Sequence, residues 1–174
     1  MNLTLHLPAM REFMQSGRNL LLRRRTVIAS ADRVLITSLV NMVGDSGRIE
    51  GAATSEREAL TCLHNGTANL LICTDLLDSG SGPSLVASAK KIRPELVCLM
   101  LIQRPLRSTI EAAIAAGCNG LCSRERVGNG HLLRALQAID SDSTYIDPVI
   151  AGVLRHSRLS RGSSPSLSNT LSLR

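Results

Sequence analysis

Five short apolar runs along the middle of the chain constrain its fold most strongly. Each run is only a few residues long, is rich in Val, Ile, Leu and Cys, and does not alternate between apolar and polar residues. Such runs are typical of parallel strands that are covered on both faces of a sheet. They occupy positions 26–29, 49–53, 70–73, 97–102 and 120–122.

Amphipathic helical patterns separate these runs and follow the last one. Their apolar positions are Leu35, Ile36, Leu39, Val40 and Val43, then Ala59, Leu60 and Leu63, then Leu85, Val86, Ala89 and Ile92, then Ile110, Ala113 and Ile114, and finally Leu132, Leu133, Leu136 and Ile139. Ser55 and Glu58 have the spacing of a capping box ahead of the second pattern. The repeated strand–helix order predicts an α/β fold, a parallel sheet with right-handed crossovers and helices on both faces. A further short helix is expected at 148–157.

The two ends of the chain carry its basic charge. Residues 1–25 hold five Arg and one Glu, and residues 148–174 hold four Arg and no acid, within a net charge of +6. Basic ends of this kind favour either solubility alone or contact with nucleic acid or another acidic surface. The Ser-rich stretch 159–174 has no periodic apolar face and predicts a flexible linker.

The first 25 residues leave two interpretations open. Met10, Phe13 and Met14 would share one face of a helix that begins at Pro8, whereas Gly17 weakens such a helix. The segment is therefore either an ordered extra helix or a flexible arm.

Composition excludes several functions. Phe13 and Tyr145 are the only aromatic residues, so a flavin or a run of unpaired bases finds no stacking platform. The five cysteines are odd in number and irregular in spacing, which indicates a reducing, cytoplasmic compartment. No apolar stretch is long enough to predict a membrane span. Neither a metal site nor a catalytic set can be assembled from the His and Cys spacing, and the chain is not expected to be an enzyme.

Ligand sites in open α/β sheets lie beyond the carboxyl ends of the strands. Asp75 directly follows the third run, and Asp32 follows the first run closely enough to reach the same edge. Asp32 is expected to cap the first helix rather than to bind a metal. His131 opens the fifth helical pattern and is expected to face solvent.

The layout of residues 26–140 resembles a response-regulator receiver domain, the CheY-like module that accepts a phosphoryl group on an aspartate. The run AAGCNGL at 115–121 is similar to the family's entry into its fifth strand, and STYIDPV at 143–149 resembles the segment after the receiver in the NarL/FixJ subfamily. The end of the chain, LSLR at 171–174, looks like the start of a LuxR-type helix-turn-helix domain. The resemblance implies a flavodoxin-like five-stranded sheet in the order 2-1-3-4-5.

The same resemblance implies the organisation of the chain and its partners. A basic extension (1–25) would precede a receiver-like domain (26–141), a C-terminal helix region (142–158), and a linker (159–174) toward a helix-turn-helix domain that is absent from this chain. We expect a homodimer that binds DNA through that missing domain, with a histidine kinase or another protein as partner and no membrane association.

Several family positions are altered here. By resemblance, Asp75 is equivalent to the phosphoacceptor, while Ser30 and Ala31 occupy the positions of the acidic pair, with Asp32 one place further on. The switch residues, a Thr or Ser and an aromatic, correspond to Ile102 and Leu121. The family's lysine corresponds to Arg124.

These changes predict a degenerate phosphorylation site. Mg²⁺ prefers octahedral oxygen ligation that includes carboxylates, and Asp75 with Asp32 alone is a poor site. Phosphoryl transfer depends on positioning and on neutralising charge, and Ile102 donates no hydrogen bond to a phosphoryl oxygen. We expect Arg124 to pair with Asp75 instead, and the regulator to work without phosphate or cofactor.

Two alternatives remain. One is a working phosphorelay through Asp75, which would need Mg²⁺. The other is a small α/β ligand-binding or enzyme domain, although no phosphate-binding glycine motif supports it.

The fifth helical pattern also suggests how two chains pair. Its apolar residues Leu132, Leu133, Leu136 and Ile139 are more numerous than one sheet contact requires, and the family commonly pairs through a surface that includes this helix. They are therefore expected to form a dimer face, or alternatively to lie wholly in the core.

Overall fold

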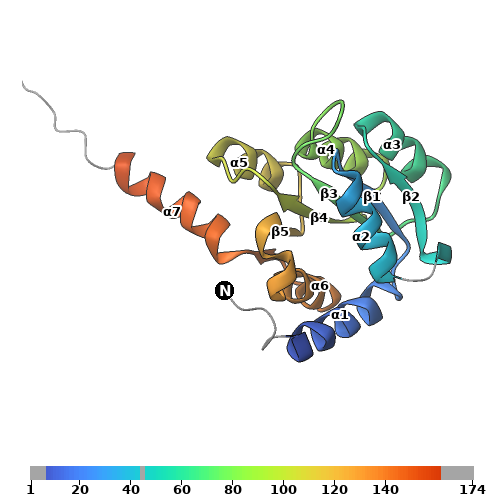
Figure 1. Ribbon diagram of the computed structural model, residues 1–174. Coiled ribbons are helices and arrows are strands. Elements are labelled where there is room, and N and C mark those ends of the chain that lie inside the picture. The colour runs from blue at the N-terminus through green and yellow to red at the C-terminus, as the bar shows by residue number, and fades with distance from the viewer. Residues whose placement is uncertain (1–6, 44–45, 162–174) are drawn as a thin grey trace, which may run out of the picture.

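A six-stranded, fully parallel sheet forms the centre of the computed structural model, which describes residues 7–43 and 46–161 (Figure 1). The strand order is β2-β1-β3-β4-β5-β6. The strands are β1 (Thr26–Ala29), β2 (Ile49–Ala53), β3 (Leu70–Thr74), β4 (Val97–Ile102), β5 (Gly120–Ser123) and β6 (Tyr145–Ile146). The predicted flavodoxin-like sheet of five strands is confirmed. β6 is an addition of two residues that pair with Gly120 and Leu121 of β5, and it is too short to leave a pattern in the sequence.

Helices cover both faces of the sheet. One layer contains α1 (Leu7–Leu21), α2 (Arg33–Val43) and α6 (His131–Asp140), and the other contains α3 (Glu56–Asn65), α4 (Gly82–Ile92), α5 (Arg107–Ala115) and α7 (Pro148–Arg161). The short 3-10 helices η2 (Ser46–Arg48) and η3 (Arg124–Asn129) complete the described elements.

Two apolar cores fill the spaces between the layers because alternate strand residues point to opposite faces. Ile28, Ile72 and Leu101 face α1, α2 and α6, whereas their neighbours Val27 and Cys73 face the other helices. None of the described helices is both long and apolar enough to cross a membrane.

The N-terminal segment is an ordered helix over the part that the structure describes. α1 packs on α6 and α2 (Figure 1). Leu21 is buried in the core, and Nε of Arg18 donates a hydrogen bond to the Val43 carbonyl oxygen at 3.1 Å. The side chains of Met10, Phe13 and Met14 lie outside the described part, so their predicted shared face is untested.

The predicted dimer face on α6 is wrong in this conformation. Its four apolar side chains are buried: Leu132, Leu133, Leu136 and Ile139 expose 5%, 8%, 3% and 4% of their surface. The alternative, that they belong to the core, is correct because α1 adds a second partner for α6 beside the sheet.

The C-terminal helix is longer than expected. α7 extends to Arg161 instead of ending at 157, so the first residues of the predicted 159–174 linker are helical. The remainder of that predicted linker, 162–174, lies outside the described residues. Ile150 of α7 is fully buried in the same core as α3, α4 and α5, which fixes the start of the helix to the domain.

Candidate functional site

The carboxylate of Asp75 lies at the carboxyl end of β3, where only 4% of the residue is exposed. Its Oδ1 accepts a hydrogen bond from the Gln103 backbone N at 2.7 Å, and its Oδ2 accepts one from the Arg104 backbone N at 3.1 Å. Both donors belong to the loop between β4 and α5. Each oxygen of the carboxylate therefore already has a main-chain partner.

The predicted pairing of Arg124 with Asp75 is wrong. The Arg124 guanidinium instead forms an ion pair with Oδ2 of Asp32, and both side chains are about one-third exposed. Asp32 also caps α2 as predicted, because its Oδ1 accepts hydrogen bonds from the backbone N of Val34 at 2.8 Å and of Leu35 at 3.1 Å. The Leu35 amide is the main cause that lowers the pKa of Asp32, and Val34 and Arg124 lower it further against the effect of burial.

The remaining positions predicted for the site line the base of this edge without contributing charge. Oγ of Ser30 accepts a hydrogen bond from the Asp32 backbone N at 3.0 Å and lies 3.1 Å from Oγ1 of Thr74. The backbone N of Ala31 donates to the Leu76 carbonyl oxygen at 3.3 Å. Ser30 thus stabilises the turn that precedes α2.

Ile102 and Leu121 each expose 1% of their surface and pack in the core beneath α5. Aliphatic side chains have no hydrogen-bond donor or acceptor, so neither residue can form a hydrogen bond to a phosphoryl group. The two switch-equivalent positions are therefore part of the packing.

A magnesium ion does not fit the groups that this edge provides. Ser30 and Ala31 supply no carboxylate, Asp32 is engaged with Arg124, and both oxygens of Asp75 face N–H donors. Within residues 7–43 and 46–161, no group of three or more His, Cys, Asp or Glu side chains is placed to hold a metal ion.

Burial keeps the cysteines of the central strands protonated. It raises the pKa of Cys98 and of Cys122 to about 12, and it raises the pKa of Cys73 as well. Because the thiolate is the nucleophilic form, these buried thiols are packing groups.

Sequence reasoning missed a buried polar cluster on the β6 side of the sheet. His131 exposes 3% of its surface, so the expectation that it faces solvent is wrong. Its Nδ1 lies 2.8 Å from the Tyr145 hydroxyl oxygen and 3.2 Å from Oδ2 of Asp147. Asp147 is fully buried, and its Oδ1 accepts from the Arg126 guanidinium at 3.2 Å and from the Val149 backbone N at 2.9 Å. The cluster joins η3, α6 and β6 to the first turn of α7.

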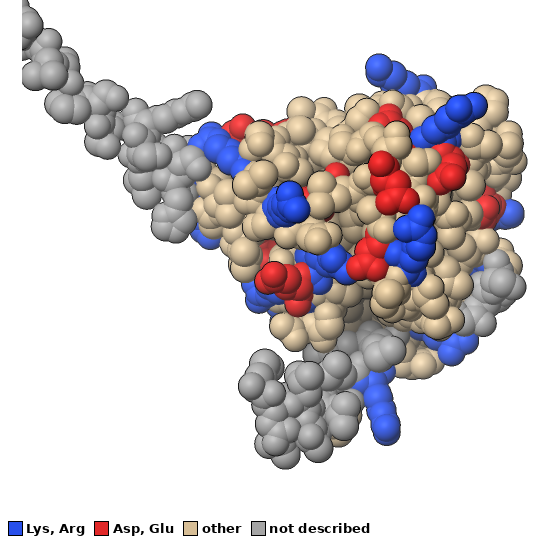
Figure 2. Space-filling model, turned by 45° about the horizontal axis from the view of Figure 1, so that its top comes forward, with Lys and Arg blue, Asp and Glu red and all other residues tan. Residues whose placement is uncertain are grey.

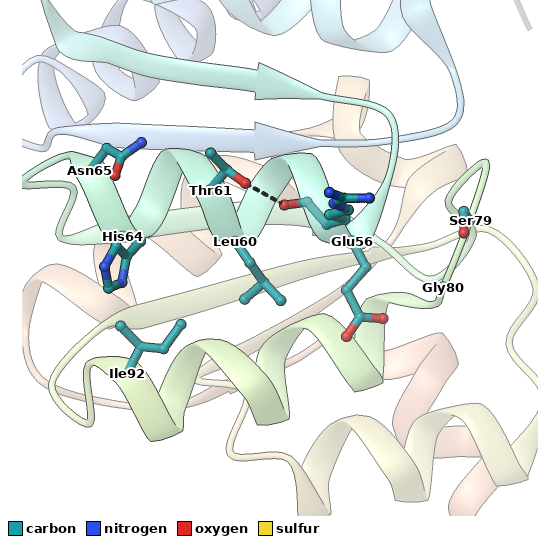
Figure 3. Close-up of a pocket in the computed structure, with 9 residues that line it drawn as sticks. Glu56, Leu60, Thr61, His64, Asn65, Ser79, Gly80 and Ile92 are labelled. Carbon is teal, nitrogen blue, oxygen red and sulfur yellow. Dashed lines mark hydrogen bonds between the residues drawn. The ribbon is translucent and has the colours of Figure 1, made fainter.

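A groove of about 600 Å³ lies between α3 and α4, away from these residues. Figure 3 shows Leu60 and His64 of α3 and Ile92 of α4 facing the space between the two helices, with Glu56 and Gly80 at one end. None of the residues predicted for the site lines this groove.

Charged side chains do not gather by sign on the face shown in Figure 2, where basic and acidic residues are interspersed. Ion pairs such as Arg33 with Asp78 and Arg107 with Glu111 also bring opposite charges together. Basic charge therefore gives no single-sign binding surface on this face.

Comparison with known proteins gives a result at the level of the fold. No protein-family model matches the sequence, and no curated protein matches it. Many solved structures do match the fold. The isolated receiver domain of RcsB from Salmonella enterica serovar Typhimurium, with the phosphomimetic BeF₃⁻, is 15% identical with a TM-score of 0.64 over 74% of this chain and 96% of that one.

Two further matches have similar values. A LuxR-family two-component response regulator from Aurantimonas sp. SI85-9A1 is 14% identical with a TM-score of 0.69, covering 78% of this chain and 98% of that one. A structure of two RcsB dimers bound to two parallel DNAs is 16% identical with a TM-score of 0.66, covering 75% of this chain and 67% of that one. The chain therefore has the fold of response-regulator receiver domains.

Proposed function

We propose that this chain is the receiver-like regulatory domain of a DNA-binding response regulator and that it works without phosphorylation. It would control dimerisation or DNA binding by a helix-turn-helix domain beyond this chain, and would act as a regulator and not as an enzyme. The fold supports this proposal, since proteins with the same fold include DNA-bound dimers. A protein partner, or a histidine kinase used as a binding partner, would supply the signal.

The state of Asp75 is the observation that carries the proposal. A carboxylate attacks a phosphoryl group with an oxygen lone pair, while cations nearby neutralise the charge that accumulates. Here both oxygens accept hydrogen bonds from the Gln103 and Arg104 amides, in a position that is almost fully buried. Attack would require the loop after β4 to move and these hydrogen bonds to break.

The neighbouring cation supports the same conclusion. Arg124 is engaged with Asp32, so its charge is directed at a different carboxylate from the one that would react. With aliphatic residues at 102 and 121, neither of these two positions offers a hydroxyl or an aromatic group that could move toward a phosphoryl group. The domain would therefore hold one conformation, and its output would depend on abundance or on a partner.

Pairing of two chains remains part of the proposal, but through a surface other than the α6 face. A symmetric dimer suits the two half-sites of a palindromic DNA sequence. Exposed apolar residues elsewhere, including Ile114 on α5 and Val149 on α7, offer contact points that need no rearrangement of the core.

Incubation with acetyl phosphate and Mg²⁺, followed by intact-mass measurement, tests the proposal. We expect the mass of the chain to remain unchanged, in the wild type and in Asp75→Asn alike. A stoichiometric phosphoryl adduct that disappears in Asp75→Asn but persists in the matched control Asp78→Asn would overturn it. That outcome would favour a phosphorelay through Asp75.

A further inference from the structure

A small cavity lies on the opposite side of the sheet from the α3–α4 groove, between α1, α2, η3 and α6. Its volume is about 210 Å³. Aliphatic side chains form most of its walls, with Leu35, Leu39 and Met42 from α2 and Leu132 and Leu133 from α6. Ser38 and Gly128 also line it and are exposed, so the cavity opens to solvent between α2 and η3.

Gly17 forms the wall contributed by α1. This residue is buried, yet a Cβ atom built on it would meet no atom of the described residues within 4 Å. Among the described residues, none fills the space that a side chain at position 17 would occupy. A glycine in a helix interior costs about 1 kcal/mol relative to alanine, so α1 keeps this opening at the expense of its own stability.

The lining selects an uncharged, apolar ligand. Among the described residues that line the cavity, none is Lys, Arg, Asp, Glu or His. Ser38 carries the one side-chain hydroxyl in that described lining, and it already donates to the Val34 carbonyl oxygen at 2.8 Å. A charged ligand would lose its hydration there without gaining a partner, which is unfavourable.

The volume limits the size of the ligand. An apolar protein cavity of about 150 Å³ is known to stay dry and to bind benzene. A cavity of 210 Å³ is larger than that but smaller than the usual pocket for a drug-sized molecule, which begins at about 300 Å³. A single aromatic ring or a fused pair of rings matches the space.

We propose that this cavity is a binding site for a small, uncharged aromatic molecule. Because α1 supplies one wall and α2 and α6 supply others, a molecule inside it adds contacts that hold α1 on the domain. The site shares no residue with the Asp75 edge, so it stands whether or not the function proposed above is correct.

Indole is a suitable probe because the chain contains no Trp, so fluorescence excited at the long-wavelength edge of the indole band, where Tyr145 does not absorb, comes from the probe alone. Titration of the full chain should give a saturable change with one indole per chain. Gly17→Leu places a side chain in the empty space and should weaken indole binding by about tenfold or more. Gly152→Leu is the matched control, since Gly152 lies on α7 with equally open surroundings, and it should bind indole as the wild type does.

The same variants separate loss of the site from loss of the fold. Leucine favours the helical conformation over glycine, so the denaturation midpoint of Gly17→Leu should equal or exceed that of the wild type. If Gly17→Leu does not fold, Ser38→Leu narrows the cavity from the α2 side and should weaken binding in the same way. Absence of saturable binding to the wild type, or equal binding by wild type and the folded filling variant, would refute the site.

Discussion

The two oxygens of the Asp75 carboxylate accept one backbone N–H each, from Gln103 and Arg104, which lie 28 and 29 residues further along the chain. A buried carboxylate without donors is costly, so Asp75 depends on the two amides for its hydrogen bonds. Asp75 thereby ties the end of β3 to the entry of α5. This role is structural, and it uses the lone pairs that phosphoryl transfer would need.

Replacing Asp75 by alanine should lower the free energy of unfolding by about 1–3 kcal/mol, because two partly buried hydrogen bonds to a charged acceptor are lost. Asp78→Ala is the control: Asp78 lies in the same loop between β3 and α4, and both partners of its ion pair with Arg33 are exposed. That control should change stability by about 0.5 kcal/mol or less. Urea denaturation measures both, and equal effects would show that the Asp75 hydrogen bonds contribute little.

His131 should make stability depend on pH above the range in which carboxylates titrate. Burial lowers the pKa of His131 more than Asp147 raises it, and Arg126 and Arg134 lower it further. The unfolded chain therefore binds a proton more readily, and stability present above about pH 6.5 is lost as the pH falls.

The measurement is the urea midpoint between about pH 7.5 and pH 5, which should decrease for the wild type and stay flatter for His131→Gln. Carboxylates contribute below this window. Burial raises the pKa of Glu50, but hydrogen bonds from Thr67 and the contact with Arg25 lower it further than burial raises it. The exposed His64 provides the control, since His64→Gln should retain the wild-type slope. A His131→Gln profile parallel to the wild type would contradict the assignment.

Local and distant contacts explain which site residues were predictable. The Asp32 cap is formed with Val34 and Leu35, so it can be inferred from neighbouring residues. The partners of Asp75 are backbone amides, which have no side-chain signature in the sequence. The burial of His131 depends on Tyr145 and Asp147, which reach it only after β6 pairs with β5.

Among the helices and strands, the guanidinium of Arg93 connects the end of α4 to the end of α3. It donates hydrogen bonds to the backbone carbonyl oxygens of Leu63 at 3.1 Å and Gly66 at 2.9 Å, and it also donates to that of Ala68. Carbonyls at a helix C-terminus lack intrahelical partners and carry partial negative charge. One planar cation thus satisfies three acceptors around the turn that leads into β3.

Arg93→Ala should destabilise the protein by about 2 kcal/mol, since partly buried hydrogen bonds from a charged donor to backbone carbonyls are lost together. Arg93→Lys should recover only part of this, because an ammonium group lacks the planar fork that reaches several acceptors. Lys91→Ala removes the same charge from an exposed position in the same helical turn and serves as the control. Thermal denaturation of the three variants is the measurement, and a full rescue by lysine would favour a simple charge effect.

Strands β1, β3, β4 and β5 were predictable from the sequence because each is a dense apolar run that is almost wholly buried, whereas β2 is a half-buried edge strand. Ser55 with Glu58 marked the start of α3. β6 was not predictable, because a strand of two residues is too short to show an apolar pattern. The helical state of residues 7–21 remained open because Gly17 opposes it locally, while the packing that supports α1 comes from α6, more than a hundred residues away.

At the scale of the whole molecule, α1 decides which surface is available for pairing. The apolar residues of α6 face both the sheet and α1, and Arg23 and Arg24 hold the end of α1 near Asp140 at 3.4 and 3.5 Å. Exposed ion pairs of this kind contribute little, so apolar contacts provide most of the stabilisation. Association of two chains through α6 would therefore require α1 to detach from α6 first. The fraction of chains in which α1 is detached limits how much association takes place.

Leu21 is the position at which this dependence can be measured. It exposes 1% of its surface and packs in the same core as Leu132, Leu136 and Ile139. Leu21→Ala should lower the free energy of unfolding by about 3 kcal/mol, as expected for a leucine truncated in a core. The exposed neighbour Asn19, changed to alanine, should have little effect on stability.

Sedimentation velocity at rising concentration should then show more self-association for Leu21→Ala than for Asn19→Ala, because weakened packing of α1 exposes α6 more often. If Leu21→Ala left both stability and association unchanged, α1 would not be part of the cooperative fold, and the α6 surface would be as available in the wild type as in the variant.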